Sequence, residues 1–304
     1  MLSRRAFLQS ALIASSGAAV GATVYDLRID GYTGSPVVEH LRIRLPNLPE
    51  AFHGYRIGFL TDIHLGMWVP HEWIHHAIEV LQKADVDILL LGGDYIFVTE
   101  NPVWRYTHCI RNSSYMDLSK SEATAKIFRE VGEIFSSYTF RDGTIGVVGN
   151  HEHWNSLPLF TETMKAFPKL RFLINEEVTI SRNGQAISLL GVDDFLTGLP
   201  TVPPPRSGTA TTRILMSHNP DYVANLLNDE PSSFDLALCG HTHGGQVRLP
   251  GVGGFIVQVQ DPRFVQGLVK IGDATVYTSR GLGVVGLPFR VNCPPEITIF
   301  ELEK

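Results

Sequence analysis

Hydrophobic and polar residues along the chain change between strand-like and helix-like periods. Apolar residues and arginines alternate at positions 41–45, as expected of a half-buried strand, and a second strand is expected at 55–60. The apolar positions of 73–81 recur with helical spacing, and the run 86–91 is apolar except for Asp87. Strand, helix and strand in this order predict a βαβ unit, and in open α/β sheets ligands bind at the C-terminal ends of the strands.

The remainder of the chain continues this mixture of strands and helices. Ser119 and Glu122 fit a capping box that begins a helix, and Asn183-Gly184 between apolar runs predicts a tight hairpin. Further strands are expected at 143–148, 186–192, 213–217, 234–239, 268–271, 275–278 and 297–302, and helices at 119–138, at 157–167 and after Asn219-Pro220. The segment 95–118 shows no clear period. The pattern predicts one α/β domain with a β-rich second half.

The N-terminal segment has the pattern of a targeting sequence. Arg4 and Arg5 precede an uncharged, weakly hydrophobic stretch, 6–24, which resembles a twin-arginine export signal. An ordinary signal or a short membrane anchor is the alternative. Export would bring the twin-arginine machinery as a partner and place the protein in the periplasm, in the cell wall or on the outer face of the cytoplasmic membrane. We therefore expect a signal or anchor at 1–24, a linker at 25–36 and the folded catalytic domain at 37–304.

Composition narrows the classes of function. A net charge of −6 argues against a nucleic-acid backbone as the main partner. The chain has three cysteines, at 109, 239 and 293, and a number that is both low and odd argues against a disulfide framework. Cys239 is expected to be a core residue. Twelve histidines are more than ordinary usage supplies, which makes metal chemistry the first possibility to consider.

Polar residues directly follow five of the predicted strands. They are Asp62 and His64, Asp94, Asn150 and His151, His218, and His241 and His243. Each cluster alone has an ordinary explanation as a turn, a cap or a loop histidine. Five of them at C-terminal strand ends predict one shared site, and neutral imidazole is the commonest side-chain metal ligand. His241 and His243, at i and i+2, would point to the same side of an extended backbone.

The order of these motifs resembles that of the calcineurin-like metallophosphoesterases. The resemblance rests on Asp62-Ile63-His64, Gly93-Asp94, Gly149-Asn150-His151-Glu152, His218 and Gly240-His241-Thr242-His243, and it covers the chain from about residue 55 to its end. The twin-arginine start and the segment 281–297 are similar to the bacterial exported phosphodiesterase branch of that family. The resemblance implies the family's four-layer α/β/β/α fold, in which two packed mixed sheets are flanked by helices.

The resemblance also implies two divalent metal ions as cofactors. One would be held by Asp62, His64, Asp94 and His243, and the other by Asp94, Asn150, His218 and His241. Asp94 would bridge the ions, because a carboxylate has two oxygens to share. Nitrogen and oxygen ligands of this kind are compatible with Mn, Fe, Zn and Co, so the sequence does not identify the metal. Two ions and two carboxylates leave a charge of about +2, which suits a phosphate ester attacked by a metal-bound hydroxide.

Two further residues receive roles from the resemblance. His151 adjoins a ligand without being one, and it is implied as the catalytic group that protonates the leaving oxygen or stabilises the transition state. Glu152 stands where the family has an acid that would orient His151. Asp94 is counted as catalytic because it would hold both ions.

The function expected from the sequence is hydrolysis of a phosphodiester or pyrophosphate, of a cell-envelope or lipid-linked substrate, close to a membrane. In the segment after Asp94, Arg105 and Arg111 are expected to grip phosphate oxygens, beside three aromatic residues that would pack on an organic group, Trp104, Tyr106 and Tyr115. A phosphomonoesterase of broad specificity is one alternative. An exported, non-catalytic metal-binding or cell-wall-binding protein is the alternative from a different class.

Overall fold

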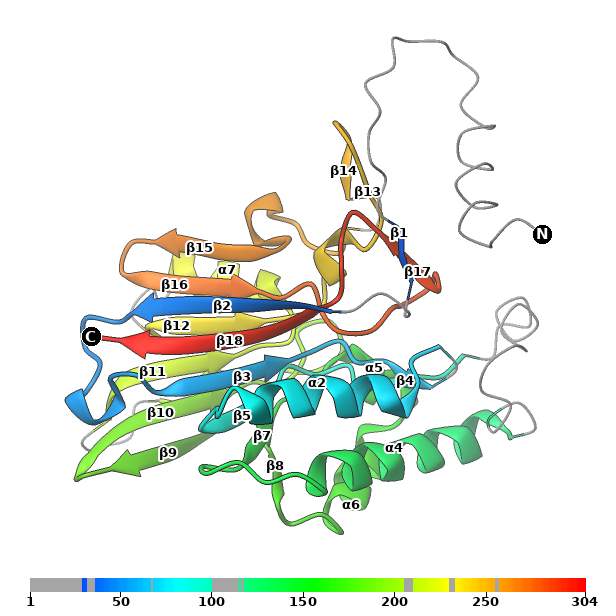
Figure 1. Ribbon diagram of the computed structural model, residues 1–304, viewed down its shortest axis with the longest axis horizontal. Helices are drawn as coiled ribbons and strands as arrows, with labels where there is room; N and C mark the ends of the chain where they lie inside the picture. Colours follow the sequence, from blue (N-terminus) through cyan, green and yellow to red (C-terminus); the bar gives the residue numbers. More distant parts are fainter. Residues whose placement is uncertain are drawn as a thin grey trace.

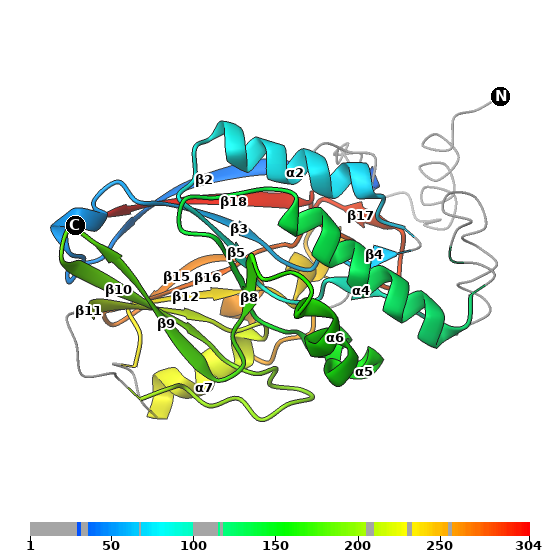
Figure 2. The ribbon, with the colours of Figure 1, turned by 90° about the horizontal axis from the view of Figure 1, so that it is seen from below.

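The computed structural model describes residues 29–31, 36–66, 68–99, 115, 118–204, 210–229, 233–254 and 257–304. These residues form two six-stranded mixed sheets that pack face to face, with helices on both outer sides, as Figure 1 and Figure 2 show. This is the α/β/β/α arrangement predicted from the sequence.

The first sheet has the strand order β2-β18-β3-β5-β7-β8. Its strands are β2 (Val37–Arg44), β18 (Glu296–Glu303), β3 (Arg56–Leu60), β5 (Ile88–Leu91), β7 (Thr144–Gly146) and β8 (Leu170–Phe172). Strands β3, β5, β7 and β8 run parallel to one another, whereas β18 is antiparallel to β3 and parallel to β2. The carboxyl ends of β3, β5 and β7 therefore meet at one edge of the sheet.

The second sheet has the order β15-β16-β12-β11-β10-β9. Its strands are β15 (Gly267–Ile271), β16 (Ala274–Thr278), β12 (Leu236–Cys239), β11 (Ala210–Met216), β10 (Gln185–Gly191) and β9 (Glu176–Arg182). The four central strands are parallel, and the two edge strands are antiparallel to their neighbours. Asn183 and Gly184 form the predicted two-residue hairpin loop between β9 and β10, with φ values of 48° and 74°.

Helices cover the outer face of each sheet. They are α2 (His71–Lys83), α4 (Lys120–Ser136), α5 (Asn150–Asn155), α6 (Leu157–Met164) and α7 (Pro220–Asp229). In Figure 2, α2 and α4 lie over the first sheet and α7 lies on the opposite side of the molecule. The predicted capping box begins α4, where the Ser119 side chain accepts from the Glu122 backbone N–H. Within the described part of the chain, no helix has both the length and the apolar character to cross a membrane.

Short elements complete the fold around the site. Three two-stranded ribbons pair β1 (Ile29–Gly31) with β17 (Phe289–Val291), β4 (Leu65–Gly66) with β6 (Ile96–Phe97), and β13 (Arg248–Leu249) with β14 (Gly253–Gly254). Single 3₁₀ turns are η1 (Glu50–Phe52), η3 (His243–Gly245) and η4 (Pro262–Phe264). Residues Ile29–Gly31 fall within the segment expected to be a linker, so part of that segment is paired with the domain.

Three hydrophobic clusters separate the four layers. In β5, Leu90 packs between the two sheets, while Leu89 belongs to the cluster beneath α2 and α4. In β12, Leu238 packs between the sheets, while Cys239 belongs to the cluster on the α7 side. Because both faces of these strands are buried, their sequences read as continuous apolar runs rather than alternating ones. Cys239 is thus a core residue, as expected.

Several predictions from the sequence fall outside the described residues. They are the twin-arginine segment 1–24 and, in the segment after β6, Arg105, Arg111, Trp104 and Tyr106. Tyr115 of the same segment is described, and it is 5% exposed and packs in the cluster beneath α2 and α4 instead of facing a substrate. The expectations for the other residues stay predictions.

Candidate metal centre

Five loops, each following a parallel strand, converge where the edges of the two sheets meet. The loops after β3, β5 and β7 come from the first sheet, and those after β11 and β12 come from the second. They carry Asp62 and His64, Asp94, Asn150 and His151, His218, and His241 and His243, in that order. None of these residues is more than 7% exposed. The strand ends therefore bring the residues predicted from the sequence into one buried region.

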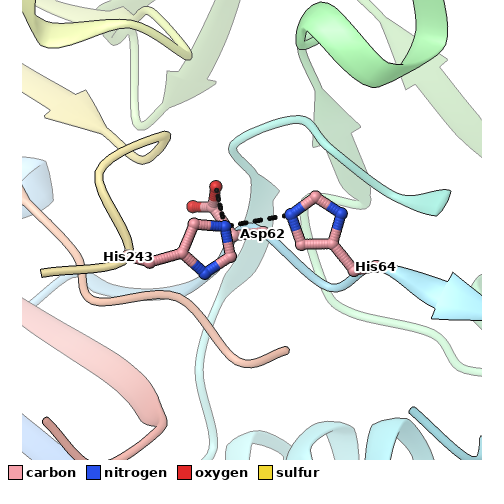
Figure 3. A group of neighbouring side chains, drawn as sticks. All are labelled: Asp62, His64 and His243. Carbon is pink, nitrogen blue, oxygen red and sulfur yellow. Dashed lines mark hydrogen bonds and ion pairs between the residues drawn. The ribbon is translucent and has the colours of Figure 1, made fainter. Parts of the chain in front are cut away.

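Asp62, His64 and His243 form the first group of side chains that point toward one another, as Figure 3 shows. The Nε2 atoms of His64 and His243 lie 3.0 Å apart, and Nε2 of His243 lies 3.4 Å from Oδ1 of Asp62. Two imidazole nitrogens and a carboxylate oxygen facing one point make a site suited to a divalent cation.

Asp94, His218 and His241 form the second group, and Asp94 links it to the first. Oδ2 of Asp94 lies 3.3 Å from Nε2 of His218 and 3.7 Å from Nε2 of His64. Oδ1 of Asp94 accepts the backbone N–H of His151 at 2.9 Å. The sequence suggested a bridge that uses both carboxylate oxygens. The structure instead turns one oxygen, Oδ2, toward both groups.

The hydrogen-bonding state of these side chains fits metal ligation. Oδ1 of Asn150 is buried and has no hydrogen-bond partner among the described residues, although buried polar atoms are nearly always paired. Nδ1 of His218 lies 2.8 Å from the Gly92 carbonyl, and Nδ1 of His64 lies 3.3 Å from the Ile96 carbonyl. When Nδ1 donates to a carbonyl, Nε2 is left as an acceptor for a metal. The residues present therefore fit two metal ions.

The backbone at the site is held in an unusual conformation. Five of the residues have positive φ: Asp62 (52°), His64 (51°), Asp94 (55°), His241 (71°) and His243 (50°). Such conformations cost about 1–3 kcal/mol each and persist where the surrounding structure enforces them. The expectation of an extended His-x-His backbone is wrong, because both histidines are in left-handed turns. Consequently His241 and His243 face different groups of ligands.

Two glycines allow the loops to approach one another. A Cβ added to Gly149 would lie 2.3 Å from Oδ1 of Asp94, and one added to Gly240 would lie 2.4 Å from Oδ2 of Asp62. Any side chain at either position would displace a carboxylate of the site. The glycines of these motifs are therefore required by close contact.

His151 lies beside both groups, but Glu152 does not orient it. His151 is buried, its Nε2 lies 3.9 Å from Oδ2 of Asp94, and its Nδ1 has no hydrogen-bond partner among the described residues. The Glu152 carboxylate instead accepts the backbone N–H groups of Asp94 (3.0 Å), Tyr95 (2.9 Å) and Gly149 (2.9 Å). Glu152 thus fastens the loop after β5 to the start of α5, and the role implied for it by the resemblance is wrong.

Burial sets most of the charge states in the site. It lowers the pKa of His64 and of His241 to about 3, so both imidazoles are neutral at pH 7. Burial alone would raise the pKa of Asp94, but the neighbouring histidines hold it well below its usual range. Burial alone would lower the pKa of His218, but the Asp94 carboxylate raises it well above its usual range. A divalent cation competes for the same nitrogen, so metal binding would release that proton.

Arg290 lies next to the site, in the segment 281–297 that contributed to the resemblance, but the sequence indicated no role for it. It is fully buried, and its guanidinium donates to the backbone carbonyls of Gly283 (2.6 Å), Arg280 (2.8 Å) and His243 (3.1 Å). Its Nη2 also faces Nδ1 of His243 at 3.3 Å. A buried arginine surrounded by carbonyls fixes the course of several chain segments at once. No periodicity or spacing in the sequence signals that role.

The chain is similar to several known proteins. "Phosphodiesterase YaeI" of Escherichia coli (strain K12) is 34% identical over 303 residues, which cover 99% of this chain and 100% of that protein. "Uncharacterized metallophosphoesterase YkuE" of Bacillus subtilis (strain 168) is 28% identical over 308 residues, which cover 99% and 98%. Among solved structures, the NAD nucleotidase of Haemophilus influenzae is similar at 12% identity with a TM-score of 0.44, over 75% of this chain and 45% of that one.

The sequence model of the calcineurin-like phosphoesterase family matches residues 55–245, and this range contains all five loops of the site. Proteins of that family use two divalent metal ions, and the two groups of aspartate and histidine described above supply places for them. The chain therefore belongs to the calcineurin-like phosphoesterases and is a metal-dependent phosphoesterase.

Proposed function

We propose that this phosphoesterase hydrolyses a phosphodiester or pyrophosphate that carries an apolar or bulky organic group. The observation that carries the proposal is the position of His151, whose Nε2 lies 3.9 Å from Oδ2 of Asp94 and which forms a third group with His64 and Asp94. We assign His151 to the reaction rather than to a metal, because the other two groups already supply places for two ions. The phosphodiesterase named among the relatives supports a diester as the substrate.

We assign the metal ligands to two sets that share Asp94. The first set is Asp62, His64, Asp94 and His243, and the second is Asp94, Asn150, His218 and His241. Two ions held there would supply Lewis acidity toward phosphoryl oxygens and would lower the pKa of the attacking water. The chain itself orients the imidazoles through backbone carbonyls and excludes bulk water by burying every ligand.

His151 acts on the leaving group in this proposal. Burial lowers its pKa, which favours a neutral imidazole in the resting site. Its backbone N–H is held by Oδ1 of Asp94, so the position of the ring is tied to the bridging carboxylate. In the reaction the ring stabilises the charge that develops on the leaving oxygen, or gives this oxygen a proton after the ring has taken one up from solvent.

We further propose that the enzyme acts outside the cytoplasm, on a cell-envelope or lipid-linked substrate. The twin-arginine pattern at Arg4 and Arg5 and the short segment that follows it support export and a position near the membrane. Arg105 and Arg111 are proposed as phosphate-binding residues from the sequence alone, and both lie outside the described residues.

A substrate panel on purified, metal-loaded protein tests the proposed chemistry. We expect aryl and alkyl phosphodiesters or pyrophosphates to be hydrolysed faster than simple monoesters. Chelation should abolish turnover, and Mn²⁺ or another transition ion should restore it, because seven buried side chains point toward the two proposed metal positions. Faster turnover of small monoesters would indicate a general phosphatase. Bound metal with no turnover of any ester would instead indicate a metal-binding protein.

Replacing Arg4 and Arg5 by lysine tests the proposed export route. The double variant keeps the positive charge but loses the arginine pair, and we expect folded, active protein to accumulate in the cytoplasm. Fractionation followed by an activity assay measures this. Arg42→Lys, on an exposed strand of the folded domain, serves as the control and should be exported normally. Normal export of the double variant would rule out the twin-arginine route.

A further inference from the structure

Helix α5 links the buried site to the surface of the molecule. His151 lies in its first turn, and three residues later Trp154 is 58% exposed. The two rings are in contact, with centroids 5.1 Å apart and an interplanar angle of 60°. Exposed apolar side chains that gather on one surface indicate a binding site, and aromatic rings supply much of the contact area at such sites.

The contact between His151 and Trp154 ends a row of aromatic rings that begins in the core. Trp68 stacks on Phe97 at 4.7 Å, and the Phe97 ring lies 5.7 Å from that of His151. Trp68 is 5% exposed and Phe97 is 9% exposed, so Trp154 is the open end of the row. The row lies beside the metal centre, and Trp154 is the ring of this row that is exposed enough to contact a ligand.

A second group of exposed apolar residues is attached to the same helix. His153, next to Trp154, contacts Oδ1 of Asp193 at 2.7 Å. Asp193 accepts the backbone N–H of Leu199 at 3.0 Å, which fixes the loop 193–199 to α5. In that loop Leu196 and Leu199 are 53% and 83% exposed. Among the described residues, half of the large exposed hydrophobic side chains thus lie on α5 or on the loop bound to it.

From this arrangement we infer that Trp154, with the loop 193–199, binds the apolar leaving group of the substrate. The inference rests on the proposed role of His151 as the acid for the leaving oxygen. The carbon that is bonded to this oxygen must lie next to His151, and the group beyond it extends toward the surface. Trp154 occupies that path. A chain of methylene groups or an apolar ring would be partly removed from water there.

Binding of two phosphonates to the metal-loaded full chain tests the inference without turnover. Methylphosphonate probes the metals alone, and octylphosphonate adds an apolar chain. We expect octylphosphonate to bind the wild-type chain about tenfold or more tightly, and Trp154→Ala to remove most of that difference while methylphosphonate binding is unchanged. Trp154→Phe, which keeps an aromatic face, should retain it. Titration calorimetry measures each affinity, with metal content and Tm as checks of folding.

Leu268→Ala is the matched control, because Leu268 is 41% exposed on the edge strand β15. It should leave both affinities unchanged. An equal loss of both phosphonates in Trp154→Ala, or an unchanged preference for the octyl chain, would overturn the inference and leave the proposed function in place. A wild-type chain that binds neither phosphonate would overturn both.

Discussion

Asp94→Asn is expected to strip the metal centre and abolish hydrolysis while the domain stays folded. Oδ2 of Asp94 faces Nε2 of His218 at 3.3 Å and of His64 at 3.7 Å, so one oxygen serves both groups of ligands. The amide keeps an oxygen that can still accept the His151 N–H, but it removes the negative charge between the histidines. Mutation of residues that merely support a ligand already weakens metal binding by about 10–100-fold, and loss of a shared ligand should exceed that.

Elemental analysis of the purified variant measures this effect directly. We expect fewer than two equivalents of bound metal, together with loss of activity. Asp235→Asn is the matched control, because Asp235 precedes β12 at the end of the sheet opposite the metal centre and accepts the Arg213 N–H. Full metal content in Asp94→Asn would contradict its assignment as the shared ligand.

His151→Ala is expected to keep both metals and lose about 10²–10⁴ in rate, the usual contribution of a positioned acid or base. Its Nε2 lies 3.9 Å from Asp94, and its ring lies between the metal centre and Trp154. The loss should shrink for esters with good leaving groups, because these need less protonation as they depart. A rate series over leaving groups of increasing acidity measures this.

A histidine of another helix provides the control for this variant. His75 in α2 contacts the Tyr138 hydroxyl at 2.8 Å, and His75→Ala should leave the rate and its dependence on the leaving group unchanged. If His151→Ala loses the same factor with every leaving group, the proton is not transferred by His151. If it loses metal, His151 is a ligand.

The layers of the fold were predictable because burial leaves a direct trace in the sequence. Residues 86–91 and 234–239 read as continuous apolar runs, since β5 and β12 are covered on both faces. The site followed from the polar residues that end those runs. Helix α5 was missed, because its six residues, Asn150–Asn155, are too few to show a helical period.

The details of the site depend on contacts between distant segments, which a single sequence does not display. His241 takes a left-handed conformation because its N–H is held by the Asp62 carboxylate, 179 residues away. Glu152 binds backbone N–H groups rather than His151, and Arg290 is surrounded by carbonyls of three loops. In each case a side chain is paired with a backbone atom of a distant segment, and backbone atoms carry no sequence signal.

The convergence of loops from both sheets has a consequence for the lifetime of the protein in its surroundings. Asp62 and Asp94 come from one sheet and His218 and His241 from the other, so a bound ion would join two layers that also meet through apolar side chains and through polar contacts such as the one between the His241 N–H and the Asp62 carboxylate. Ligands that bind only the native state stabilise it by about 2.7 kcal/mol at a hundredfold excess over Kd. Where metal is scarce, we therefore expect the chain to lose resistance to unfolding and proteolysis together with its activity.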